Sequence, residues 1–312
     1  MNKKRYPQIH FDTFIEDLAK GEEINVPEDK REINVCVSGG GMACMYSSGL
    51  LAFLYYLEKH NKVKIKHLYG ASAGAISCFF YLLFVYKQNI GLNDFNVSKF
   101  ISDINNILKS KYAKHPYVID NWMEYIEENI SDGFYEYCSN KLFVTIHVIE
   151  NGFWFVQKTV SVFTSNEHLI NILRCSGTIP YVTVPTGSTE LYNTEQYAYD
   201  GIYPQVVDNT RWTLYVNVIK HNYPLLKRMT ICDKSYEPLL IEGVYDIYHF
   251  YSGLKPDTEN KGVIYYYKNK REKQIDIKNN IEHQLKKRGC LGMGNIINMA
   301  VTAVTALIFI IL

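Results

Sequence analysis

Apolar and polar positions alternate along the chain in a way that predicts strands and helices in turn. Ile33 to Val37 is a short apolar run that leads into glycines, as a strand entering a turn does. Met45 to Leu57 has apolar residues at helical spacing, and Lys62 to Tyr69 predicts a second strand. The apolar stretch from Ala75 to Tyr86 predicts a buried helix, because it is too short to span a bilayer. This βαβα order indicates a parallel sheet with right-handed crossovers.

The pattern continues less regularly through the second half of the chain. Residues 89–140 mix amphipathic helical segments with polar breaks. Further on, the pattern predicts two strands joined at Asn151-Gly152, then a helix, then another strand, at Leu142 to Ile149, Phe153 to Phe163, Asn166 to Cys175 and Leu214 to Ile219. We expect an α/β domain over residues 31–285, with a core at 33–219, a lead-in at 1–30 and an appendage of uncertain order at 222–285.

The strongest change of composition comes at the C-terminus. Leu291 to Leu312 contains no charged residue, and as a helix it would be about 33 Å long, enough for a hydrocarbon core of about 30 Å. The bases Lys286-Lys287-Arg288 precede it, so the positive-inside rule places the rest of the protein in the cytosol. We expect a tail-anchor transmembrane helix at 291–312; the alternative is a buried C-terminal helix. Polar residues recur along this segment at helical spacing, at Asn295, Asn298, Thr302 and Thr305. In lipid their side chains could hydrogen-bond another helix, which predicts self-association of the tail.

Charge and cysteine content narrow the classes of function. The formal net charge is +1, with 33 basic and 32 acidic residues, so the chain has no field of the kind that nucleic-acid binding needs. The seven cysteines are scattered and form no C-x-x-C pair, which favours free thiols in a reducing compartment over a zinc site. Met1 to Phe14 lacks the apolar core of a secretory signal. We therefore expect a cytosolic domain that binds no nucleic acid.

One serine stands in a pattern that favours nucleophilic chemistry. Ser72 lies between a predicted strand and a predicted helix, in Gly70-Ala71-Ser72-Ala73-Gly74, and small neighbours allow the sharp turn of a nucleophile elbow. The pentapeptide alone is as typical of a tight helix-packing turn. However, Gly39-Gly40-Gly41 ends the preceding parallel strand, and parallel strands bring their carboxyl ends to the same edge of a sheet. The backbone N–H groups of these glycines are therefore candidate oxyanion donors beside Ser72.

A phosphate site is the other use of such a glycine loop. The chain has neither G-x-x-x-x-G-K-[ST] nor a G-x-G-x-x-G followed by a suitably placed acidic residue. Nucleotide binding is therefore disfavoured.

Four segments, in order and spacing, carry a resemblance to a known family. They are Gly39-Gly40-Gly41-Met42-Ala43-Cys44 with Gly49, His67 to Ala75, Arg174 to Tyr181, and Tyr199-Asp200-Gly201. Together they resemble the patatin-like phospholipases, nearest to the adiponutrin and triglyceride-lipase branch, over Ile33 to about Ile219. The resemblance implies a three-layer α/β fold with a mostly parallel central sheet, to which the C-terminal transmembrane helix is added.

The resemblance also implies a catalytic apparatus without histidine, metal or cofactor. Ser72 becomes the acyl-enzyme nucleophile and Asp200 its base, while Gly39, Gly40 and Gly41 supply the oxyanion hole. The implied reaction is hydrolysis of a carboxylic ester in a lipid, with phospholipid the first substrate and acylglycerol or lysophospholipid the next. Two positions depart from the family pattern, because Ala43-Cys44 replaces a basic residue and glycine, and Ile202 replaces the second glycine of D-G-G.

Two other interpretations stay open at this stage. A Ser-His-Asp triad would need one of the histidines that follow Ser72, namely His147, His168, His221, His249 and His283, none of which lies in a recognisable triad context. A membrane-bound binding or scaffold protein would keep the fold while Ala43-Cys44 and Ile202 impair the chemistry.

Overall fold

The computed structural model describes residues 11–92, 96–99, 103, 118–150, 154–222, 236–254 and 263–268. In these residues the strands form a mixed eight-stranded sheet, with β4 (Trp154–Val160) paired to β3 outside the order β5-β6-β3-β2-β1-β7-β8. The central strands β3 (Leu142–Glu150), β2 (Lys64–Ala71), β1 (Glu32–Val37) and β7 (Trp212–Val216) run parallel. The predicted α/β class with a mostly parallel central sheet is confirmed.

The predicted βαβα unit forms the centre of the molecule. β1 runs through the glycine loop and the short 3-10 helix η2 (Gly41–Ala43) into α2 (Cys44–Lys59), which returns the chain to β2. β2 then passes through Ser72 into α3 (Ala73–Asn89). β1 and β2 are parallel neighbours, so the loops that follow their carboxyl ends lie at the same edge of the sheet.

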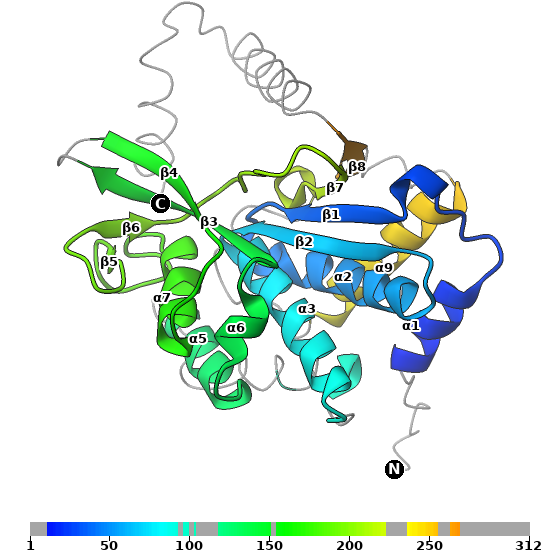
Figure 1. The fold of residues 1–312 in the computed structure, drawn as a ribbon, viewed down its shortest axis with the longest axis horizontal. Coiled ribbons are helices and arrows are strands. Elements are labelled where there is room, and N and C mark those ends of the chain that lie inside the picture. Colours follow the sequence, from blue (N-terminus) through cyan, green and yellow to red (C-terminus); the bar gives the residue numbers. More distant parts are fainter. Residues whose placement is uncertain are drawn as a thin grey trace, which may run out of the picture.

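The core lies between the sheet and its helices. Ile33, Val35 and Val37 of β1 alternate with Asn34 and Cys36, and only the first set joins the main apolar cluster, because successive residues of a strand point to opposite faces. The helices lie on that face in Figure 1, and all contribute side chains to the cluster. They are α2, α3, α1 (Phe11–Lys20), α5 (Val118–Asn129), α6 (Phe134–Cys138), α7 (Asn166–Ser176) and α9 (Glu237–Ser252). The described helices thus form one layer; a second helical layer, which the three-layer expectation requires, is not among the described elements.

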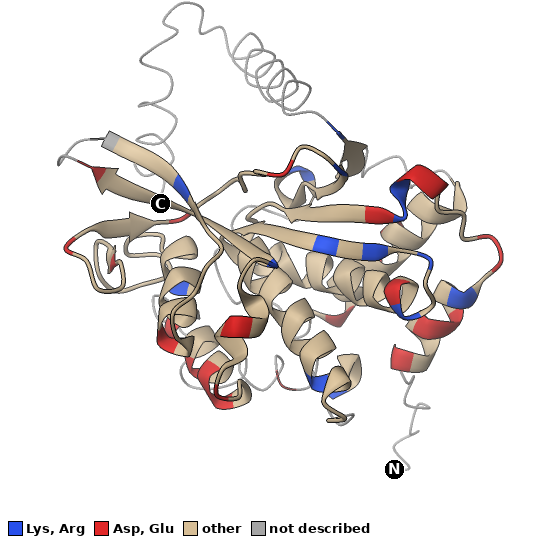
Figure 2. Cartoon of the chain, in the orientation of Figure 1, with Lys and Arg blue, Asp and Glu red and all other residues tan. Residues whose placement is uncertain are grey.

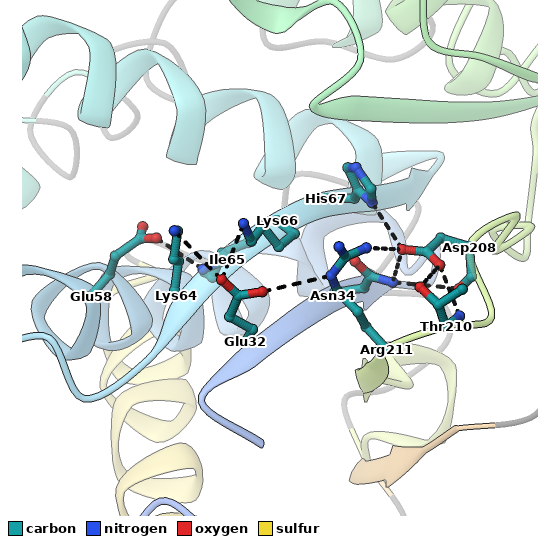
Figure 3. A network of polar contacts seen from close by, with 10 residues as sticks. All are labelled: Glu32, Asn34, Glu58, Lys64, Ile65, Lys66, His67, Asp208, Thr210 and Arg211. Carbon is teal, nitrogen blue, oxygen red and sulfur yellow. Dashed lines mark hydrogen bonds and ion pairs between the residues drawn. The ribbon is translucent and has the colours of Figure 1, made fainter. Parts of the chain in front are cut away.

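The other face of the sheet carries a small aromatic cluster and the segment 200–211. The cluster contains Cys36, Tyr69, Val206, Tyr215 and Tyr267. The segment contains Asp208, whose carboxylate accepts hydrogen bonds from the hydroxyl of Thr210 (2.6 Å), the guanidinium of Arg211 (2.7 Å) and the amide of Asn34 (3.4 Å). Figure 3 shows the carboxylate of Asp208 facing these residues. Burial alone would raise the pKa of Asp208, but these hydrogen bonds outweigh it and hold the pKa well below its usual range.

The short strand β6 (Tyr197–Tyr199) explains how the Asp200 loop reaches the end of β2. One edge of β3 is occupied along residues 144–150 by β4, so β2 and β6 share its other edge. β2 pairs with β3 up to Ala71, and β6 pairs antiparallel with β3 at His147 and Val148. The two strands therefore approach each other end to end, and the residues that follow them meet.

Two elements from the predicted appendage belong to this same core. β8 (Ile264–Tyr267) pairs antiparallel with β7 and extends the sheet. α9 packs against α2 so closely that Gly49 has no room for a Cβ beside the carbonyl of Leu240, nor Gly243 beside that of Tyr46. The hydroxyl of Tyr46 also donates to Asp246 across this buried contact (2.8 Å). The regular domain therefore extends beyond residue 219.

No helix in the described ranges is long and apolar enough to cross a membrane. The predicted span, Leu291 to Leu312, and its basic flank Lys286-Lys287-Arg288 lie outside the described residues, and so does His283.

Figure 2 shows basic and acidic residues of the described elements scattered among one another in this view. None of the five cysteines in the described ranges forms a disulfide.

Candidate active site

Ser72 sits at a sharp turn between β2 and α3, as the sequence predicted. Its backbone has φ 54° and ψ −137°, a conformation that is costly for any residue with a Cβ and that clusters at functional sites. Gly74 allows this turn, because a Cβ there would lie 2.5 Å from the carbonyl oxygen of Ser38. Gly70 likewise has backbone of Ala75 where a Cβ would stand. Ser72 is the N-cap of α3, so the positive end of the helix dipole lies beside its hydroxyl.

Asp200 follows β6 and faces Ser72 directly. The hydroxyl of Ser72 donates to Oδ2 of Asp200 at 2.5 Å. The other carboxylate oxygen accepts the N–H of Ile202 at 2.7 Å, an Asx-type turn that fixes the carboxylate. Gly201 lies against β3, where the carbonyl of Thr145 leaves no room for a Cβ. The structure therefore brings the two predicted catalytic residues into hydrogen-bond contact across 128 positions of sequence.

The environment of Asp200 changes its acidity. Burial raises the pKa of Asp200 to about 6, although the hydrogen bonds from Ser72 and Ile202 act in the opposite direction. A carboxylate in this range accepts a proton more readily than an ordinary aspartate and is still mostly ionised at neutral pH. Asp200 is thus electrostatically suited to act as a general base.

The three glycines predicted to form the oxyanion hole differ in whether their backbone N–H groups are already hydrogen-bonded. The N–H of Gly39 donates to the carbonyl of Ile202 at 2.9 Å, so it is already engaged. A Cβ on Gly39 would lie 2.9 Å from that of Ser72, and one on Gly40 would lie 2.5 Å from Val218. Within the described residues, the N–H groups of Gly40 and Gly41 donate to no acceptor. The loop therefore approaches Ser72 closely and leaves two backbone donors available.

None of the described histidines contacts the hydroxyl of Ser72. His147 contacts the acid instead, since its Nδ1 donates to the backbone carbonyl of Asp200 at 2.8 Å. His168 stacks on Tyr192 and bonds to Thr164, and His221 lies against Tyr46. His249 lies in α9. The arrangement in the described chain is therefore a direct serine–aspartate contact, with His147 supporting the backbone of the acid.

The two departures from the family pattern have structural consequences. Cys44 begins α2 and is buried, and burial raises the pKa of its thiol to about 12, so it stays protonated. Ile202 has φ 51°, which is an outlier for a β-branched residue and the conformation that a glycine would adopt without strain. The strain at Ile202 lies directly beside Asp200 and is held by the two hydrogen bonds that Ile202 makes to Asp200 and Gly39.

Sequence reasoning gave no role to one residue that touches both halves of the site. Ser176, the last residue of α7, contacts the backbone of Ser72 and of Gly201. The one feature of the sequence that could have pointed to Ser176 is its place in the segment Arg174 to Tyr181, which resembles a family motif. In the described residues no three His, Cys, Asp or Glu side chains gather as metal ligands would.

Comparison with known proteins identifies the region that holds these contacts. The family model described as patatin-like phospholipase matches residues 35–210, which is more than half of the chain and includes the glycine loop, Ser72, Ser176 and Asp200. No curated protein matches the chain.

Proposed function

Because the chain belongs to the patatin-like phospholipase family and so to lipid acyl hydrolases in general, we propose that it acts through a Ser72–Asp200 dyad and an acyl-enzyme. The observation that carries the proposal is the 2.5 Å hydrogen bond from the Ser72 hydroxyl to Asp200, at an elbow faced by a glycine loop. We further propose that the protein is membrane-anchored through Leu291 to Leu312, with this domain in the cytosol. The substrate we favour is phospholipid, followed by acylglycerol or lysophospholipid, and the branch of the family that we favour is that of adiponutrin and triglyceride lipase.

In the proposed first half-reaction, Asp200 accepts the proton of the Ser72 hydroxyl while its oxygen attacks the acyl carbon. The N–H groups of Gly40 and Gly41, with that of Ala73 after the nucleophile, stabilise the oxyanion. Gly39 serves by its lack of a side chain, since its N–H is engaged by Ile202. Collapse of the intermediate breaks the ester bond, and the leaving alcohol takes the proton from Asp200.

In the second half-reaction, Asp200 accepts a proton from water while the water oxygen attacks the acyl-enzyme. Collapse of this second intermediate returns the proton to Ser72 and releases the fatty acid. Calcium has no step in this scheme, so activity should persist in the presence of EDTA.

A small apolar hollow lies in the helical layer. It lies between α2, α3 and α9 and is lined by side chains that include Leu51, Tyr55, Phe80, Phe84 and Leu240. Ser77, also on its wall, is little more than one helical turn beyond Ser72 on α3. Its volume is about 40 Å³, which is too small for the acyl chain of a lipid, so it gives no substrate site in this conformation.

Covalent labelling tests the proposal directly. The full-length protein in phosphatidylcholine–detergent micelles should react with a fluorophosphonate probe and release fatty acid, whereas Ser72→Ala should do neither. Release should fall by at least about 10³-fold, because loss of a nucleophile removes the covalent pathway. Fatty acid and lysophospholipid are measured by mass spectrometry. Absence of labelling in the wild type would favour a binding or scaffold protein, and a histidine-to-alanine variant without turnover would favour a triad.

The pH dependence of turnover follows from the acidity of Asp200. We expect kcat/KM for a water-soluble short-chain ester to rise tenfold per pH unit below about pH 6 and to level off above it, because the base must be ionised. The measurement is an initial-rate series from pH 4.5 to 8.5. A level profile through pH 5 would contradict the assignment of Asp200 as the base.

A further inference from the structure

Ser176 joins three parts of the active site through one buried residue. Its hydroxyl accepts the N–H of Ser72 at 2.8 Å and donates to the carbonyl of Thr145 on β3 at 2.7 Å. Its own carbonyl accepts the N–H of Gly201 at 3.2 Å. Ser176 has no exposed surface, so it is shielded from water and from substrate. The nucleophile, the strand and the loop of the acid are thus tied to the end of α7.

The contact to Ser72 meets a physical need of the elbow. Ser72 holds an unfavourable backbone conformation, which persists only where the surroundings over-determine it. Its N–H is 2.8 Å from the Ser176 hydroxyl in a buried position, where an unmatched donor is costly. A hydroxyl can accept this N–H and donate to a carbonyl at the same time, which neither a methyl group nor a backbone carbonyl can do.

The contacts on the acid side do not depend on the same hydroxyl. The N–H of Asp200 donates to the carbonyl of Thr178 at 2.9 Å, and that of Gly201 to the carbonyl of Ser176. Loss of the Ser176 hydroxyl would therefore release the elbow while the backbone of Asp200 stays tied to the end of α7.

We propose that Ser176 is a positioning residue of this active site, whose hydroxyl holds the Ser72 oxygen within hydrogen-bond reach of Asp200. The inference rests on the dyad proposed above and adds to it a residue that touches neither substrate nor reacting atoms. Of the two catalytic residues, the hydroxyl of Ser176 holds Ser72 alone. The catalytic constant therefore depends on it, and substrate affinity does not.

The test compares Ser176→Ala with Ser47→Ala in the full-length protein. Ser47 is a matched control, because it is equally buried, donates to the carbonyl of Cys44 at 2.8 Å and bonds to Ser77, yet contacts neither Ser72 nor Asp200. Both variants should melt at lower temperature than the wild type. Only Ser176→Ala should lose kcat, by about 10²-fold, with KM for a soluble ester unchanged, since small misplacement of reacting groups has effects of this size.

Two further readouts separate positioning from a general structural effect. The hydrogen bond from Ser72 lowers the pKa of Asp200, so loosening it should move the acidic limb of the pH profile upward in Ser176→Ala and leave it in place in Ser47→Ala. Ser176→Thr keeps the hydroxyl and should restore part of the lost kcat. Ser176→Cys has nearly the volume of serine with a much weaker donor and acceptor, and should lose kcat like the alanine variant even if the latter fails to fold.

The inference is overturned if Ser176→Ala or Ser176→Cys folds with the kcat of the wild type, or if Ser47→Ala loses kcat to the same extent. Failure of the proposed function looks different, because the wild type would then neither react with the fluorophosphonate nor turn over ester.

Discussion

Asp200→Asn is expected to abolish ester hydrolysis and at the same time to raise the melting temperature of the protein. The loss of activity follows from the loss of the base, and we expect at least about 10³-fold in kcat. The gain in stability follows from the pKa of about 6, because an acid whose pKa rises on folding binds protons more tightly in the folded state. Asparagine keeps an oxygen for the N–H of Ile202 and an amide for the Ser72 hydroxyl, without a charge to bury.

The sign and the pH window follow from the same pKa. Between about pH 4, the unfolded value, and about pH 6, the folded state holds more protons than the unfolded state, so stability falls as pH rises. At neutral pH the ionised Asp200 therefore lowers the free energy of unfolding by about 1–3 kcal/mol, and the lower figure allows for the partial exposure of its side chain. Asp200→Asn should melt roughly 2–10 °C higher at pH 7.5, and the difference should shrink toward pH 4.

Asp208→Asn serves as the matched control, since it removes an aspartate from the same segment with the opposite pKa shift. The hydrogen bonds around Asp208 hold its pKa below the usual range despite burial, so its ionised form stabilises the fold above about pH 4 and that stability is lost as pH falls. This variant should melt lower than the wild type at pH 7.5. If Asp200→Asn melts lower as well, the ionised carboxylate of Asp200, whose pKa burial raises, does not destabilise the fold.

Gly243→Ala and Gly49→Ala are each expected to destabilise the domain by about 2–4 kcal/mol, even though alanine favours helices by about 1 kcal/mol over glycine. A methyl group on either glycine would collide with backbone of the facing helix, which cannot rotate away as a side chain can. α2 and α9 would have to separate, and the Tyr46 to Asp246 hydrogen bond between them would lengthen.

Thermal denaturation followed by circular dichroism measures this effect. Gly21→Ala is the control, because a Cβ there meets only the carboxylate of Glu23, the far end of a flexible side chain. Unchanged melting of Gly243→Ala would mean that α2 and α9 are not in backbone contact.

The parts of the fold that follow local pattern were predictable from sequence. The predicted strand Ile33 to Val37 and helix Met45 to Leu57 agree with β1 and α2 within a few residues, because both are rich in apolar residues and bounded by glycines or charges. The strand predicted to Ile219 was wrong at its end. β7 stops at Val216, and the N–H of Asn217 instead donates to the carbonyl of Val263 before η3 (Val218–Lys220) begins.

The parts that depend on distant contacts were not predictable. β5 (Thr189–Glu190) and β6 are too short to carry a periodic signal, yet β6 delivers Asp200 to Ser72. Family resemblance named both residues, but their contact depends on β3 holding β2 and β6 at one edge. The role of Ser176 is still less visible, because a serine at a helix end is ordinary and its hydrogen bonds cross 104 and 31 positions of sequence.

The pairing of β8 with β7 sets a lower limit on any shortened version of this protein. The family match ends at residue 210. A fragment that ended soon after β7 would leave that strand with one row of unpaired backbone groups, because β8 would be missing. It would also expose the face of α2 against which α9 packs. Bare strand edges and uncovered helix faces are sites of aggregation. A soluble recombinant domain must therefore extend at least to Tyr267, well beyond the region that sequence similarity delimits.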